Sequence, residues 1–116
     1  MNVKEFYLQT GGNYEEVLGR LIKEERIVKY LRKFADGNDC KLICEAFENR
    51  DYEAAFRNVH NLKGVALNLG LTNLQLAASD LCEEVRNGAP NKDVSGMIEN
   101  VVKVYTSDVE AIGRIE

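Results

Sequence analysis

The chain has 116 residues, enough for one domain, and 45% of them are apolar, enough for one modest core. A formal charge of −4 and the lack of a basic run argue against nucleic acid as a partner. No stretch is long and apolar enough to span a membrane, and the N-terminus lacks the apolar centre of a signal peptide, so we expect a cytoplasmic protein without membrane contact.

The composition favours helices, because Leu, Glu, Lys, Arg and Ala dominate and there is one proline. Asn13 is placed to cap a first short helix, with Glu16 three residues on as in a capping box. Its apolar positions are Leu18, Leu21 and Ile22. A longer helix follows over residues 24–35, with apolar residues at helical spacing, and Asp36-Gly37-Asn38 stops it.

Asp39 is expected to cap the next helix, which extends to about Asn49. Asp51 is expected to cap a helix over residues 52–69, and Gly70 ends it. Its apolar residues recur in steps of three and four, as in a helix of a bundle: Tyr52, Ala55, Val59, Leu62, Ala66 and Leu69.

Thr72 and Gln75 form a capping pair for the following helix, which closes at Gly88 and Pro90, and the last helix covers about residues 92–115. Amphipathic helices joined by short loops cannot bury their apolar stripes alone. We therefore predict an all-α, antiparallel four-helix bundle with additional short N-terminal helices. The whole chain, 1–116, is predicted to be a single domain with its bundle core at about 24–115.

The only histidine, His60, lies on the helix predicted over residues 52–69. It sits well round the helix from the apolar seam, so we expect its ring to face solvent or the rim of the bundle. Lys63 follows at i+3, near enough for its ammonium to reach a group carried on the ring. A phosphoryl group would bring close to two negative charges and three acceptor oxygens, and a neutral imidazole is a suitable nucleophile for it.

Gly64 is unusual inside a helix, where glycine costs about 1 kcal/mol relative to alanine. Helical side chains lean toward the N-terminus, so we expect any side chain at this position to crowd the imidazole at i−4. Glycine would leave the ring open to an incoming group. The alternative is that the glycine serves close helix packing and that the histidine is an ordinary surface residue.

The run His60-Asn61-Leu62-Lys63-Gly64, followed by Leu69-Gly70, resembles the His-x-Leu-Lys-Gly signature of histidine phosphotransfer domains. Similar residues extend over about 14–115. They include Leu18-Gly19-Arg20-Leu21, Phe34, Asn49-Arg50-Asp51-Tyr52 and Leu81-Cys82-Glu83.

The resemblance implies a phosphorelay carrier. His60 would accept a phosphoryl group on Nε2 from a receiver-domain aspartate and pass it to another receiver aspartate. Lys63 would stabilise the phosphoryl oxygens and Gly64 would keep the approach clear. The expected partners are response-regulator receiver domains, including that of a hybrid histidine kinase. Mg²⁺ would belong to the receiver. With no P-loop or ATP site of its own, the chain is expected to be a monomeric carrier rather than an enzyme. Its 116 residues starting with methionine favour a free-standing carrier, and a module of a larger kinase is the alternative.

Receiver docking is expected on the surface around the histidine, at Phe56, Asn61, Leu67 and Asn68. Periodicity does not settle whether Phe56 and Leu67 stay exposed or tuck into the edge of the bundle. A helical-bundle adaptor that binds a partner without chemistry is the alternative function.

Cys82 stands where many family members have a glutamine or another hydrogen-bonding side chain opposite the histidine. Ser79 and Arg86 could substitute for it, but we favour core packing for Cys82 and a solvated surface charge for Arg86. The three cysteines and the histidine could also hold a metal, although their spacing matches no known pattern: Cys40, Cys44, Cys82 and His60.

Overall fold

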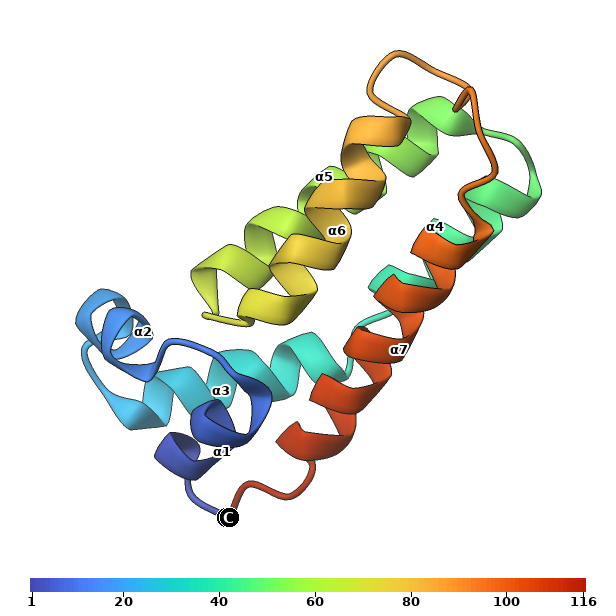
Figure 1. The fold of residues 1–116 in the computed structure, drawn as a ribbon. Coiled ribbons are helices and arrows are strands. Elements are labelled where there is room, and N and C mark those ends of the chain that lie inside the picture. The colour runs from blue at the N-terminus through green and yellow to red at the C-terminus, as the bar shows by residue number, and fades with distance from the viewer.

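The structure, a computed structural model, describes residues 1–116 and consists of helices and connecting loops (Figure 1). The helices are α1 (Val3–Thr10), α2 (Tyr14–Leu21), α3 (Glu24–Ala35), α4 (Asp39–Glu48), α5 (Tyr52–Asn68), α6 (Thr72–Glu84) and α7 (Ser95–Ile112). Helices α4 to α7 form the antiparallel bundle, and α1 to α3 gather at one end of it. The predicted all-α bundle with short N-terminal helices is confirmed.

Helix α5 lies between α4 and α6 and contributes a continuous buried stripe. Ala55, Val59, Leu62 and Ala66 have no exposed surface, at the spacing of one helix face. Val59, Leu62 and Ala66 belong to one apolar cluster that α3, α4, α6 and α7 share. Truncating a fully buried leucine such as Leu62 would cost about 2–5 kcal/mol. The seam faces inward, so the opposite face of α5 is turned toward solvent.

Several predicted helix ends are confirmed. Asn13 accepts a hydrogen bond from the Glu16 N–H at 3.1 Å. Asp51 does the same for the Ala54 N–H at 3.1 Å. Gly70 follows α5 with a φ of +67°, in the left-handed region that glycine adopts without strain. Because this turn is short, α5 and α6 run antiparallel and pack closely along their lengths (Figure 1).

Other predicted ends are wrong. Ile22 is not an apolar position of α2; it ends that helix with a φ of +73° and is 69% exposed. Neither Asp39 nor Thr72 caps its helix with a side-chain hydrogen bond, because each already lies inside the first turn. Helix α7 begins at Ser95 rather than near residue 92. Just before it, the Asp93 carboxylate accepts the Ser95 N–H at 2.9 Å.

Helix α1 has no counterpart among the predicted elements. Its N-terminus carries a complete capping box, in which Asn2 accepts the Glu5 N–H at 2.8 Å and Glu5 accepts the Asn2 N–H at 3.2 Å. Phe6 and Tyr7 are buried against the end of the bundle. The two chain ends also meet: the Met1 ammonium donates to the Arg114 carbonyl at 2.9 Å, and the terminal residue's N–H donates to the Met1 carbonyl at 2.9 Å.

None of the seven helices combines the length and the apolar character that crossing a lipid bilayer requires.

Candidate functional site

His60 lies on the outward face of α5 and is exposed, as predicted. Its ring receives no hydrogen bond and makes no ion pair, so both ring nitrogens are free of protein partners. One turn earlier, the Phe56 ring lies nearly parallel to the imidazole, with centroids 5.7 Å apart and planes inclined by 13°. This contact follows from helix geometry, because side chains lean toward the N-terminus and meet the residue at i−4.

Lys63 is half-buried at the edge between α5 and α6, and no carboxylate lies within ion-pair distance of it. Its charge is felt on α6. There the hydrogen bond and charge of Arg86, together with the charge of Lys63, lower the pKa of Glu83. The ammonium of Lys63 therefore stands beside α6, near Cys82 and Glu83.

The side chains of α6 that could have bonded the imidazole do not do so. Cys82 is 1% exposed and belongs to the core, which confirms the packing interpretation. Burial raises the pKa of its thiol, with the positive charges of Lys63 and Arg86 opposing that effect. Arg86 is a surface charge whose Nε lies 3.2 Å from Glu83 Oε2, so its guanidinium is already engaged.

Gly64 is exposed, and a Cβ built at this position meets no atom within 4 Å. The expectation that any side chain here would crowd the imidazole is therefore wrong, because a methyl group would not touch the ring. Helix packing does not require the glycine either, since nothing packs against it. The access role of Gly64 stays a prediction, now confined to side chains longer than a methyl group.

The chain matches the family model of the Hpt domain over residues 14–111. This chain belongs to the Hpt domain family. Hpt domains are histidine phosphotransfer carriers of phosphorelays; they have no catalytic site of their own, and their partners are receiver domains. The match begins with α2 and ends within α7, so it includes the whole bundle and leaves α1 outside. Neither the curated proteins nor the solved structures contain a match.

The predicted docking residues of this Hpt domain lie on the same helix as the histidine but differ in exposure. Asn61 and Asn68 are exposed, and Leu67 is 47% exposed. Phe56 is half-buried and packs against the apolar core. The two interpretations of the apolar edge are therefore split: Leu67 remains available to a partner, whereas Phe56 is anchored inward and presents one face.

A groove of about 600 Å³ adjoins Asn68 between α2, α3 and α5. Its walls include Leu21, Tyr30, Phe34, Val65 and Leu69, with Lys33 at the rim. The sequence analysis singled out no residue of α3 as exposed, because Tyr30 falls off the apolar stripe of that helix. Tyr30 is 42% exposed and widens the apolar surface beside the histidine face.

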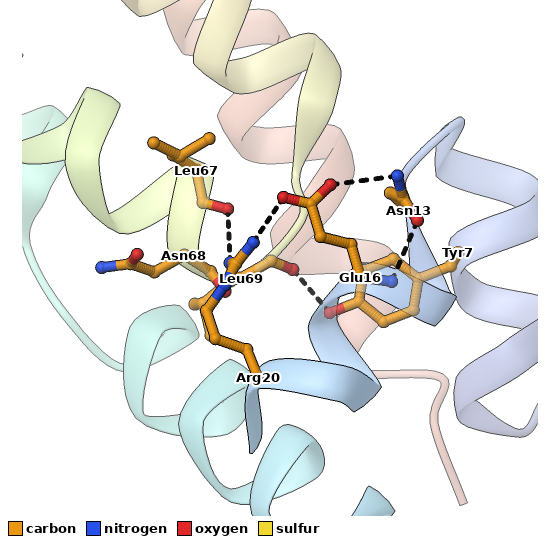
Figure 2. Close-up of polar contacts among 7 residues, drawn as sticks. All are labelled: Tyr7, Asn13, Glu16, Arg20, Leu67, Asn68 and Leu69. Atoms are coloured by element: carbon orange, nitrogen blue, oxygen red, sulfur yellow. Dashed lines mark hydrogen bonds and ion pairs between the residues drawn. The ribbon is translucent and has the colours of Figure 1, made fainter. Parts of the chain in front are cut away.

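The C-terminal end of α5 is held by a side chain from α2 (Figure 2). The guanidinium of Arg20 donates to the carbonyl oxygens of Leu67 at 3.0 Å and Asn68 at 2.7 Å. Glu16 holds the same guanidinium at 2.6 Å. The last carbonyls of a helix lack partners within it, and a cation there also complements the helix dipole. Arg20 therefore fixes the end of the helix that carries the histidine.

Tyr7 of α1 completes this cap (Figure 2). Its hydroxyl donates to the Leu69 carbonyl at 2.6 Å in a buried position. Burial, reinforced by the negative charge of Asp108, raises the pKa of this phenol well above its usual value, so it remains a donor. Neither capping residue, Arg20 or Tyr7, is predictable from local sequence, because the targets are backbone atoms distant in sequence.

No group of three or more His, Cys, Asp or Glu side chains is arranged to hold a metal ion. Cys40, Cys44, Cys82 and His60 therefore do not form the four-ligand site considered from the sequence. Cys82 is in the core while His60 is on the surface.

Proposed function

We propose that this Hpt domain accepts a phosphoryl group on Nε2 of His60 from the aspartate of one receiver domain and passes it to the aspartate of another. The observation that carries the proposal is the position of His60: the only histidine of a chain that belongs to this family is exposed and free of hydrogen-bond partners. A phosphoacceptor needs an exposed ring whose attacking nitrogen is free, because that nitrogen has to approach phosphorus within a second protein's active site.

In the transfer, the lone pair of Nε2 attacks phosphorus while the bond from phosphorus to the aspartate oxygen breaks, so one N–P bond replaces one P–O bond and the carboxylate is regenerated. Delivery to the second receiver is the reverse exchange. Such transfers depend on alignment and on stabilising charge at the equatorial oxygens. Lys63 follows the ring at i+3 with no ion-pair partner, and in this proposal its ammonium meets those oxygens.

The receiver supplies the rest of the machinery in this proposal. Mg²⁺ stays with the acidic pocket of the receiver, and no ATP enters. The receiver docks on Asn61, Leu67 and Asn68, whereas Phe56, half-buried and packed against the core, stays outside the contact. The exposed apolar area of Leu67 between two amides suits a transient interface, which combines an apolar centre with a polar rim.

The test is phosphotransfer from receiver domains that have been phosphorylated beforehand in the presence of Mg²⁺. We expect the wild-type chain to gain one acid-labile, base-stable phosphate and His60→Gln to gain none, with unchanged far-UV circular dichroism. Equal labelling of His60→Gln would refute the proposal. Binding of receivers without any labelling of the wild type would instead favour a helical-bundle adaptor in which the histidine is incidental.

A further inference from the structure

We propose that Phe56 is a positioning residue that holds the His60 imidazole in the orientation needed for transfer, an inference that rests on the function proposed above. The two rings are nearly parallel, at 13°, with centroids 5.7 Å apart. These values lie within the range of an offset stack of aromatic rings. Phe56 thereby acquires a role distinct from contact with a partner.

The two ends of this contact differ in freedom. Phe56 is half-buried and packs against the apolar core, so the bundle fixes its ring. His60 is exposed, and the structure gives its ring no hydrogen bond and no ion pair. A ring with no hydrogen-bond partner therefore rests on an anchored one. Neither Cys82, which is buried in α6, nor Arg86, which follows α6 and is engaged with Glu83, offers an alternative support.

Stacking restricts the imidazole without consuming a nitrogen. The second side-chain torsion of histidine is broad and has few intrinsic preferences, so an exposed ring samples many orientations. A stack against Phe56 disfavours the orientations in which the imidazole is not parallel to the phenyl ring. The lone pair of Nε2 lies in the plane of the ring and points from its edge, so contact with a ring face leaves the attacking electrons free.

The expected effect is on the transfer step and not on docking. Receiver encounter depends on the outer surface, whereas productive attack depends on how often the nitrogen is aligned with phosphorus. From the usual strength of an aromatic stack, loss of the aromatic face should slow the maximal transfer rate by about three- to tenfold. The receiver concentration at half-maximal rate should stay the same.

The test compares Phe56→Leu, which keeps apolar volume at the core edge but removes the aromatic face, with Phe56→Tyr, which keeps the face. Single-turnover transfer from a phosphorylated receiver is measured over a range of receiver concentrations. In parallel, NMR records the carbon-bound ring protons of His60, whose shifts respond to the ring current of a stacked neighbour. We expect Phe56→Leu to lower the maximal rate and shift these resonances, and Phe56→Tyr to restore both.

A wild-type maximal rate in Phe56→Leu, or a loss confined to the half-maximal receiver concentration, would overturn the positioning role. Unshifted His60 resonances in Phe56→Leu would also overturn it, and this result needs no phosphotransfer. A wild-type chain that accepts no phosphate would refute the proposed function and the inference together, so the two failures are distinguishable. Should Phe56→Leu lose the bundle by circular dichroism, Phe56→Met replaces it under the same criteria.

Discussion

Asp108 is the only charged residue that the fold buries, and it should make the stability of the fold depend on pH. It lies on α7, is 5% exposed, and makes no side-chain hydrogen bond or ion pair. It borders a cavity of about 220 Å³ between α1, α6 and α7, together with Thr10, Asn73 and Lys103. Burial in this position raises the pKa of the carboxyl from 3.8 to about 6.

The sign of the effect follows from this direction. Below the unfolded pKa, near 4, the carboxyl is protonated in both states and costs nothing. Between about pH 4 and pH 6 the folded state holds the proton more tightly, so stability falls as pH rises. Above about pH 6 the penalty is constant. A pKa of about 6 in place of 3.8 corresponds to about 3 kcal/mol. Solvent screening through the open cavity reduces this to about 1–2 kcal/mol.

Asp108→Asn keeps the shape of the side chain and removes its charge. At pH 7.5 we expect the free energy of unfolding to rise by about 1–2 kcal/mol, and Tm by about 4–8 °C for a chain of this size. At pH 4 the variant and the wild type should be equally stable. Urea unfolding followed by circular dichroism at both pH values measures the difference. Asp80→Asn is the matched control, because it removes the same charge from an exposed position.

The reasoning would be refuted by an Asp108→Asn variant that gains no stability at pH 7.5, or by a gain of equal size at pH 4. A gain of the same size in Asp80→Asn would show that overall charge, and not burial, is responsible.

Substitutions at three further positions, Gly64, Lys63 and Tyr7, test other contacts. Gly64→Ala should retain transfer and raise the free energy of unfolding, measured in urea, by about 1 kcal/mol, because alanine favours the helix and its methyl group meets no atom within 4 Å. Gly64→Gln should remain folded but block transfer. Unchanged transfer by Gly64→Gln would contradict the role of Gly64 in access to the ring. Lys63→Ala should slow single-turnover transfer by about tenfold at unchanged stability, whereas Lys4→Ala, on α1, should not. Tyr7→Phe should lower the free energy of unfolding by about 1–2 kcal/mol, because it leaves a buried carbonyl of α5's terminal turn without its donor, and an unchanged urea midpoint would contradict that.

The bundle was predictable where local signals and core packing agree. Residues 24–35 carry an apolar stripe that the core buries, and Asp36-Gly37-Asn38 follows it, so both ends of α3 were predicted correctly. Gly70 has the positive φ that its place after a helix suggests. Helix α1 has eight residues, too short for a clear period, although the Asn2 and Glu5 capping pair was present in the sequence. Thr72 failed as a cap because Leu71, fully packed in the core, takes the cap position.

The sequence predicted which residues lie on the face of His60, but not the contacts that their side chains make. The angle around α5 that separates His60 from the seam correctly predicted exposure. The same helical row contained Phe56 at i−4, so the stack was within reach of the sequence, but its existence depends on the core fixing the phenylalanine. The effect of Gly64 was overstated, because periodicity gives the row of a residue and not the clearance around it. The hydrogen bond from Arg20 to the end of α5 spans 47 residues and depends on how the helices pack, so no local pattern could predict it.

The meeting of the two chain ends makes this fold a candidate for circular permutation. With Met1 and Arg114 joined by a 2.9 Å hydrogen bond, a short glycine linker could close the backbone into a ring without moving either end. A new start in the loop between α6 and α7 would cut no helix and would leave the histidine-bearing α5 in mid-chain. Helices α7 and α1 would then be consecutive elements. Helices α1 and α2, which carry the capping residues Tyr7 and Arg20, would be joined covalently to α7 on one side and to α3 on the other.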